Sequence, residues 1–148
     1  MVDTIYALAT PLGRAGVAVV RVSGPDAFMS LHSLCNDIGI KPRKTILCDL
    51  YTQEGLHLDK ALVLPFKGPN SFTGEDVVEL HLHGSIAVIQ KTLETLSKIT
   101  NFRQALPGEF TRRAFSNEKL DLAEIEGLAD LIEAETEAQR VQALKVLS

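Results

Sequence analysis

The stretch from Gly68 to Gly84, GPNSFTGEDVVELHLHG, contains the residues of this chain best suited to chemistry. In its second half, valine and leucine alternate with Glu79, His81 and His83. Successive side chains of a strand point to opposite faces, so one face of this strand meets a core and the other carries a carboxylate and two imidazoles. A polar face of this composition indicates a binding site.

A metal site is one interpretation of this face. One carboxylate and two histidines are the ligand types of a mononuclear iron or zinc site. However, side chains at positions i and i+2 of a strand lie about 7 Å apart, and ligand sets usually draw on a second element. Three interpretations of His81 and His83 therefore stay open: metal ligands, residues that line or support a pocket, and solvated side chains. We assign no metal ligand.

Arg21 stands in the otherwise apolar run from Val17 to Val22. An unpaired charge buried in such a strand would cost several kcal/mol. Arg21 must therefore either reach water from a strand at the edge of a sheet or meet a partner of opposite charge. The residue pattern leaves both possibilities open.

Two further strings could present polar groups. The segments Gly68–Ser71 and Thr73–Asp76 have turn composition that can direct main-chain N–H groups at an anion, although such turns commonly bind nothing. The string Pro107–Phe110 predicts a short helix that begins at Pro107, with Arg112 and Arg113 outside and a structural role. No Ser/His/Asp or Cys/His arrangement has supporting context, so we assign no catalytic residue.

Composition limits the class of protein. The chain has 148 residues and 45% hydrophobic content, enough for one domain with a core. No apolar run approaches the roughly 20 residues of a membrane span, and the N-terminus lacks the pattern of a signal peptide. Cys35 and Cys48 show neither disulfide nor zinc spacing. We therefore expect a soluble protein of the reducing cytoplasm, without a membrane partner.

Charge is distributed unevenly along the chain. The net charge is −4, and residues 121–148 contain seven acidic and two basic residues, so this segment carries −5 and the remainder +1. Neither part has the basic excess needed to neutralise phosphates along RNA or DNA, although the cluster Lys41, Arg43 and Lys44 could contact one. Binding to nucleic acid would therefore need help from other parts.

Apolar periodicity predicts strands alternating with helices. The first helix follows Gly24, has Pro25 in its first turn, and places Phe28, Leu31 and Leu34 on one face. The second helix presents Ile86, Ile89, Leu93 and Leu96. The predicted strands are Thr4–Thr10, Val17–Ser23, Ile46–Thr52, Asp59–Phe66, Val77–His83 and, more weakly, Phe102–Ala105.

These elements predict an α+β fold with a mixed β-sheet packed with helices, followed by a long α-helix. Ile46–Thr52 and Asp59–Phe66 flank a Gln53-Glu54-Gly55 turn and form a predicted hairpin. We place a boundary near residue 118. The last helix, which opens at Asp121, has an apolar stripe that it cannot cover itself. The chain is then the front part of a longer protein, or its last helix folds back or dimerises.

Three strings, in this order and spacing, resemble the bacterial tRNA-modifying GTPases of the MnmE (TrmE) family. They are DTIYALATPLGRAGVAVVRVSG from Asp3, GPNSFTGEDVVELHLHG from Gly68, and PGEFTRRAFSNEKLDLAEIEGLADLIEAET from Pro107. The family's usual PPGRGG differs here at Leu12 and Ala15, its HGG at Ser85 and its RPGEF at Leu106. The glycine losses at Ala15 and Ser85 put a close backbone approach in doubt, and Leu106 removes a cation.

The resemblance implies a tetrahydrofolate-binding and dimerisation domain over residues 1–117, with an aminomethyltransferase-like fold, and the first helix of a helical domain over 118–148. It also implies that Arg21, Glu79 and Lys119 bind 5-formyltetrahydrofolate or 5,10-methylenetetrahydrofolate. As a hypothesis, Arg21 lies nearer the ring and Lys119 nearer the tail. A carboxylate such as Glu79 suits the parallel N–H and amino donors of a pterin.

For the parent protein, the resemblance implies a homodimer and a GTP-binding domain that uses magnesium and potassium. It further implies an MnmG-type FAD-dependent partner, with which an aminomethyl-type group is installed at C5 of the tRNA wobble uridine. These 148 residues contain no GxxxxGK[ST] motif, so we expect no GTP hydrolysis from them alone. Two alternatives stay open: a free-standing folate-dependent one-carbon transferase and a non-catalytic dimerisation module.

Overall fold

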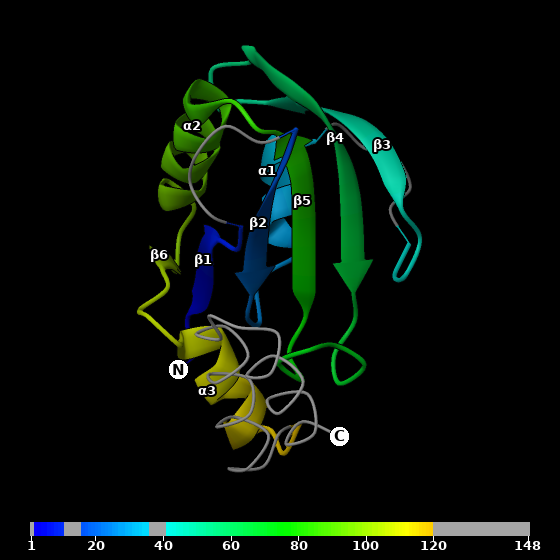
Figure 1. Ribbon diagram of the computed structural model, residues 1–148, viewed down its shortest axis with the longest axis vertical. Helices are drawn as coiled ribbons and strands as arrows, with labels where there is room; N and C mark the ends of the chain where they lie inside the picture. Colours follow the sequence, from blue (N-terminus) through cyan, green and yellow to red (C-terminus); the bar gives the residue numbers. More distant parts are fainter. Residues whose placement is uncertain (1, 11–15, 36–40, 120–148) are drawn as a thin grey trace, which may run out of the picture.

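The structure of the protein is a computed structural model that describes residues 2–10, 16–35 and 41–119. A six-stranded mixed sheet and the helices packed with it form its framework (Figure 1). The strands follow the order β3-β4-β5-β2-β1-β6. Only β6 runs parallel to its neighbour; the other described pairings are antiparallel. The elements are β1 Thr4–Leu8, β2 Val17–Ser23, α1 Met29–Leu34, β3 Ile46–Tyr51, β4 His57–Phe66, β5 Val77–His83, α2 Ile86–Ser97, β6 Phe102–Gln104 and α3 Glu109–Ser116.

The predicted α+β class is therefore confirmed. The predicted strands Val17–Ser23 and Val77–His83 have the predicted bounds, and the predicted hairpin is formed by β3 and β4. Its turn uses Gly55 at φ 82, the left-handed region in which glycine is favoured. The final helix and its contacts lie outside the described residues.

The core lies between one face of the sheet and the helices α1 and α2. Val20, Leu80 and Leu82 contribute from the two central strands, while Leu34 and Leu96 contribute from the helices; all are at most 2% exposed. Alternation along β2 and β5 therefore sends their odd-numbered side chains to the opposite face. The buried cysteines, Cys35 and Cys48, are free thiols on the core side.

The first helix begins later than predicted, because the chain after Gly24 forms a turn. The Thr4 hydroxyl accepts a hydrogen bond from the Asp26 N–H at 2.9 Å, and successive main-chain bonds span three residues. Pro25 consequently lies in this turn, outside the helix, and α1 begins at Met29. The predicted face is confirmed by the burial of Leu31 and Leu34 and the packing of Phe28 against the core.

The second helix buries most of the predicted stripe: Ile89 and Leu96 are buried, and Leu93 packs against the core. Ile86 is the exception, at 48% exposed, and Thr92 and Thr95 are buried in addition. Their hydroxyls donate to the carbonyls of Val88 and Lys91 at 2.8 and 2.7 Å, which satisfies both polar groups inside the helix. Threonine can therefore take core positions that an apolar pattern does not reveal.

The predicted β1 strand also ends early, at Leu8. The Val19 N–H donates to the Thr10 side chain at 3.1 Å instead of to a main-chain carbonyl, so the ladder stops there. Helix α3 and the loop of residues 67–76 lie together at one end of the sheet, beside the start of β1 (Figure 1). This end holds the polar groups described next.

Candidate functional site

Arg21 and Glu79 form an ion pair on the face of the sheet opposite the core. They occupy directly opposed positions of the antiparallel pair β2 and β5. Arg21 Nε and Nη2 both approach Glu79 Oε2, at 3.1 and 3.0 Å. The two side chains are 27% and 20% exposed, so the pair is half-buried. Because β2 is an interior strand, Arg21 is held by a partner and does not escape from a sheet edge.

Two aromatic rings flank the Arg21 guanidinium. Its Cζ atom lies 5.5 Å from the ring centre of Phe72 and 5.6 Å from that of Phe110. A cation at this distance from a ring face is attracted by the ring quadrupole. The rings come from the 67–76 loop and from α3, so three separate parts of the chain meet at this cation.

Two cavities share Phe72 as a lining residue. The larger, about 630 Å³, is lined by Arg21, Phe110 and the 105–108 segment. The smaller, about 390 Å³, is lined by Glu79, Lys119 and Arg43 among others. Phe72 lines both. The three residues predicted to bind folate thus lie in one region. Arg21 lines the larger cavity, and Glu79 and Lys119 line the smaller one.

The histidines of β5 have different surroundings. His81 Nε2 lies 3.4 Å from Glu79 Oε1, whereas the exposed His83 ring lies 2.7 Å, through Nδ1, from Asp59 Oδ1. Glu79, His81 and His83 therefore do not converge, and the described ranges contain no group of three potential metal ligands. His81 contacts the Glu79 carboxylate, so it adjoins the candidate site.

The 67–76 loop is held by its own polar groups. The main-chain N–H of Gly68 donates to Asp76 at 2.9 Å, that of Gly74 to Ser71, and that of Glu75 to the Thr73 hydroxyl. These donors are used within the loop. The loop therefore contributes mainly the Phe72 ring to the site.

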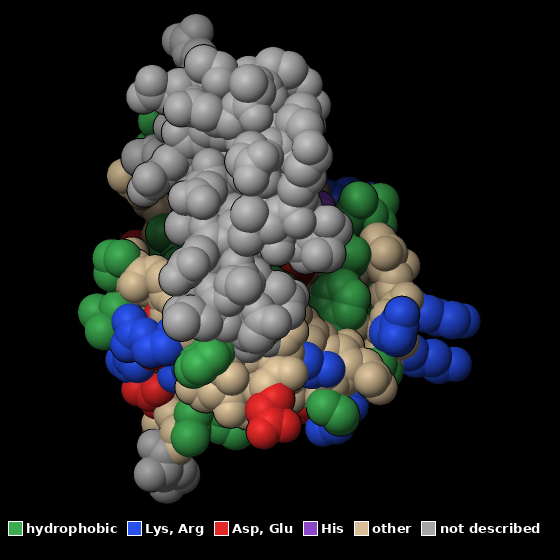
Figure 2. Space-filling view, turned by 60° about the horizontal axis from the view of Figure 1, so that its bottom comes forward, with side chains coloured by type: hydrophobic (Ala, Val, Ile, Leu, Met, Phe, Trp, Pro, Cys, Tyr) green, Lys and Arg blue, Asp and Glu red, His purple; other side chains and the backbone are tan. Residues whose placement is uncertain are grey.

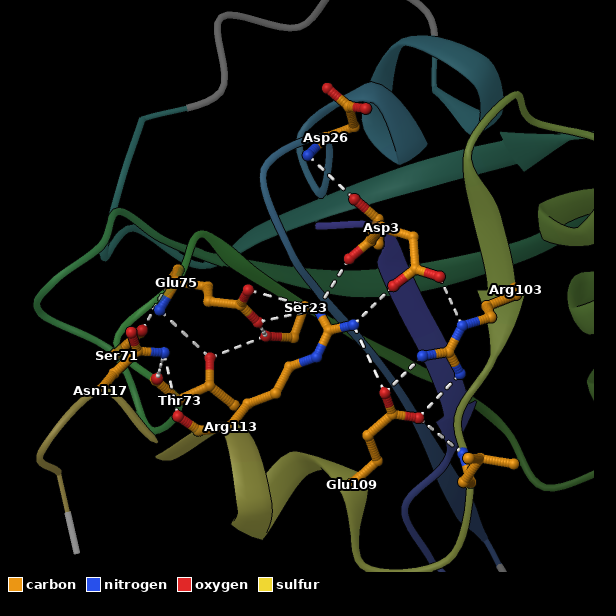
Figure 3. Close-up of polar contacts among 12 residues, drawn as sticks. Asp3, Ser23, Asp26, Ser71, Thr73, Glu75, Arg103, Glu109, Arg113 and Asn117 are labelled. Carbon is orange, nitrogen blue, oxygen red and sulfur yellow. Dashed lines mark hydrogen bonds and ion pairs between the residues drawn. The ribbon is translucent and has the colours of Figure 1, made fainter. Parts of the chain in front are cut away.

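An ion network of Asp3, Glu75, Arg103, Glu109 and Arg113 secures this end of the protein (Figure 3). Arg113 donates to Asp3 Oδ1 at 2.8 Å and to both Glu75 oxygens at 3.2 Å. Arg103 donates to Glu109 Oε1 at 2.8 Å and also to Asp3. Four separate segments are joined in this way: the start of β1, the loop, β6 and α3.

The structure corrects our expectation for the Pro107–Phe110 string. The helix begins at Glu109, after Gly108 at φ 73, and the Arg113 side chain is only 12% exposed. Arg113 therefore points inward, against the prediction, because three carboxylates surround it. The spacing of Glu109 and Arg113, four residues apart on one helix, was the available signal for this network.

The charges of Asp3, Arg103 and Glu109 stabilise one another. Hydrogen bonds from Arg103 lower the pKa of the buried Glu109 carboxyl to about 2, and they also lower the pKa of Asp3. The Glu109 carboxylate in turn raises the pKa of Arg103 above its ordinary value. Charged partners and hydrogen bonds thus outweigh the cost of burial.

Asn117 connects α3 to the loop and thereby places Lys119. Its amide donates to the Thr73 carbonyl at 2.8 Å, while the Lys119 N–H donates to the Ala114 carbonyl at 2.8 Å. Gly74 lies so close that an added Cβ would meet Asn117 Cβ at 2.8 Å. Close backbone approach therefore holds Lys119 beside the smaller cavity.

Comparison with known proteins identifies the family. Residues 4–119 match the family described as "GTP-binding protein TrmE N-terminus". The chain belongs to this family. Proteins named "tRNA modification GTPase MnmE" align with nearly all of it: 56% identity over 146 residues in Roseobacter denitrificans, 56% over 144 in Parvibaculum lavamentivorans and 54% over 148 in Maricaulis maris. These alignments cover 99%, 97% and 100% of this chain.

The chain spans about a third of the length of the curated relatives it matches, 33–34% in these three. The predicted resemblance to the MnmE family is thus confirmed for this TrmE N-terminal domain. Within the described residues, no helix combines the length and apolar character required to cross a membrane.

Proposed function

We propose that this TrmE N-terminal domain binds a reduced folate through Arg21, Glu79 and Lys119, and that it dimerises. The observation that carries the proposal is the half-buried Arg21–Glu79 pair, with the Arg21 guanidinium over the ring of Phe72, a residue that lines both cavities. The ligand is 5-formyltetrahydrofolate or 5,10-methylenetetrahydrofolate. No catalytic residue and no metal ligand is assigned.

The donor and acceptor capacity of Glu79 fits a pterin. Both bonds from Arg21 go to Oε2, and Oε1 has a contact of 3.4 Å with His81. A carboxylate has about four acceptor positions, so Glu79 can still accept from the parallel N–H and amino groups of a pterin. Phe72 offers a ring face, and it lies next to both cavities.

The two cations contact different parts of the folate. Arg21 is tied to Glu79 and belongs near the ring, whereas Lys119 lines the smaller cavity and suits the carboxylates of the tail. When bound, the folate supplies the one-carbon unit. The protein's own residues bind and orient it, since none of the described side chains is arranged as an activated nucleophile.

The parent protein is proposed to be a cytoplasmic tRNA-modifying GTPase. Its further domains bind GTP with magnesium and potassium, and an MnmG-type FAD-dependent partner joins it to act on C5 of the tRNA wobble uridine. The names of the relatives, tRNA modification GTPases, support the tRNA-modifying and GTPase parts of this proposal. This domain is not expected to hydrolyse GTP alone.

Dimerisation is supported by apolar side chains on the sheet face that carries the Arg21–Glu79 pair. Val17, Leu47 and Leu62 are 54%, 58% and 42% exposed, and the last two are paired across β3 and β4. Exposed apolar side chains of this size favour burial against a partner. Homodimerisation through residues 1–117 would cover them and bring the folate site near the shared interface.

Light scattering tests the dimer. The chain should have the mass of a dimer at micromolar concentration, and Leu62→Asp should yield monomers. Leu56→Asp, at a 62% exposed position in the β3–β4 turn, is the matched control and should leave the dimer intact. A monomeric native chain would refute this part of the proposal.

Calorimetry with 5-formyltetrahydrofolate tests the folate site. Replacing Glu79 by glutamine removes charge-assisted hydrogen bonds worth about 1.5–3 kcal/mol, a loss of roughly 10-fold to 150-fold in affinity. Glu94→Gln, on the exposed surface of α2, is the control and should bind normally. Unchanged affinity in a folded Glu79→Gln variant would eliminate the pterin anchor.

A further inference from the structure

The exposed turn Lys41–Lys44, here called the basic turn, has a strained conformation. The Lys44 N–H donates to the Lys41 carbonyl at 3.2 Å, which places Pro42 and Arg43 at its central positions. Arg43 has φ 66, and its N–H donates to the Pro65 carbonyl at 2.7 Å. Proline followed by a residue with positive φ is the pattern of a type II turn, where glycine is preferred.

An arginine in this position has an energetic cost. A non-glycine residue in the left-handed region carries a steric strain that glycine does not. The chain nevertheless has a guanidinium at the one residue of the basic turn where glycine would fit better. A gain from the Arg43 side chain would explain this choice.

Arg43 also lines the smaller cavity, together with Glu79, Phe72 and Lys119. Within the described part of the chain, neither Arg43 nor Lys119 has an ion-pair partner. Figure 2 shows Lys and Arg side chains projecting into solvent on the right-hand flank of the molecule. The cavity thus combines one carboxylate with two cations, and Lys41 and Lys44 are exposed in the same turn as Arg43.

We infer that this site takes folates carrying a γ-linked oligoglutamate chain, and that Arg43 and the basic turn bind its added carboxylates. The inference rests on the proposed folate function. Each γ-linked glutamate adds one free carboxylate. The two cations that line the cavity, Lys119 and Arg43, and the exposed Lys41 and Lys44 beside Arg43 match such a chain in charge. The basic turn is therefore a specificity determinant for the length of the folate tail.

RNA is the competing ligand for these cations. A phosphate backbone requires a broad basic surface, whereas residues 1–120 carry only a small positive excess. Arg43 moreover lines the same cavity as Glu79, the carboxylate proposed to anchor the pterin. These observations favour a ligand that occupies the cavity and extends from it.

Calorimetry with monoglutamyl and triglutamyl 5-formyltetrahydrofolate tests the inference. Two added exposed ion pairs should make the triglutamate bind about tenfold tighter at low ionic strength, and less so at high salt. Arg43→Gly combined with Lys44→Gln should reduce the ratio of triglutamate to monoglutamate affinity to within about twofold, and this ratio, measured in the variant itself, is the readout. Glycine suits the backbone at position 43, so the variant is expected to fold.

Lys98→Gln is the matched control, because Lys98 is an exposed lysine at the end of α2 that pairs with Glu54 and Glu94. It should retain the triglutamate advantage. Equal affinities of the native chain for the two folates would overturn the inference while leaving the folate site intact. Failure of both ligands to bind would overturn the folate proposal and this inference together.

Fluorescence anisotropy with a tRNA distinguishes the competing ligand. The Arg43→Gly, Lys44→Gln variant should bind tRNA as the native chain does. If the variant instead loses tRNA affinity and keeps the triglutamate advantage, the basic turn is an RNA contact and the inference is wrong.

Discussion

Replacing Glu109 by glutamine should remove a large part of the stability of this domain. The Glu109 side chain is 7% exposed and accepts hydrogen bonds from Arg103, Arg113 and the Leu106 N–H. Its pKa falls from 4.5 to about 2 on folding, chiefly because of Arg103. At about 1.4 kcal/mol per pKa unit, the charged form contributes roughly 3 kcal/mol to the free energy of unfolding.

The pH dependence has a defined sign. Because the folded-state pKa lies below the unfolded-state value, the contribution is complete above about pH 4.5 and is lost as the pH falls toward about 2. The difference in free energy of unfolding between the native chain and Glu109→Gln should therefore be about 3 kcal/mol at pH 7 and should shrink across this window.

Urea denaturation at a series of pH values measures this difference. A loss of about 3 kcal/mol corresponds to a fall of roughly 6–12 °C in Tm for a domain of this size. Glu94→Gln is the control, because the Glu94 side chain is 52% exposed and its ion pairs with Lys91 and Lys98 lie on the surface. A difference below about 0.5 kcal/mol, or one that stays constant from pH 7 to pH 2, would refute the reasoning.

Three further predictions concern the backbone, the thiols and the aromatic wall. Gly24→Ala should cost more than about 2 kcal/mol in urea denaturation, because its Cβ would lie 2.6 Å from a β1 main-chain carbon, whereas Gly55→Ala meets no atom within 4 Å and should cost only about 1 kcal/mol. Equal costs would contradict this explanation. Burial raises the pKa of Cys35 to about 12 and also raises the pKa of Cys48. Iodoacetamide should therefore label both thiols in concentrated urea and neither thiol in the native chain at pH 7, and rapid labelling of the native chain would disprove the burial. Phe72→Ala removes a 41% exposed ring, so it should change the free energy of unfolding by less than about 1 kcal/mol. Calorimetry should show folate binding weakened about threefold to tenfold, and undiminished binding would exclude the ring from the site.

Local sequence pattern was sufficient to predict the central strands. The alternation around Glu79 identified the bounds of β5 and the face on which its carboxylate lies. This works because successive strand side chains alternate whatever the strand pairs with. The family strings likewise predicted the membership now confirmed over residues 4–119.

Strand pairing and long-range contacts decided the rest of the site. Arg21 meets Glu79 because β2 and β5 are antiparallel neighbours in one register, and no spacing along the chain encodes that register. Arg113 points inward because Asp3 and Glu75, distant in sequence, meet it there. The sequence by itself determined which residues are polar and which strand face they share. The tertiary structure decided which charges meet, because ion pairing depends on distances between segments that only the folded chain brings together.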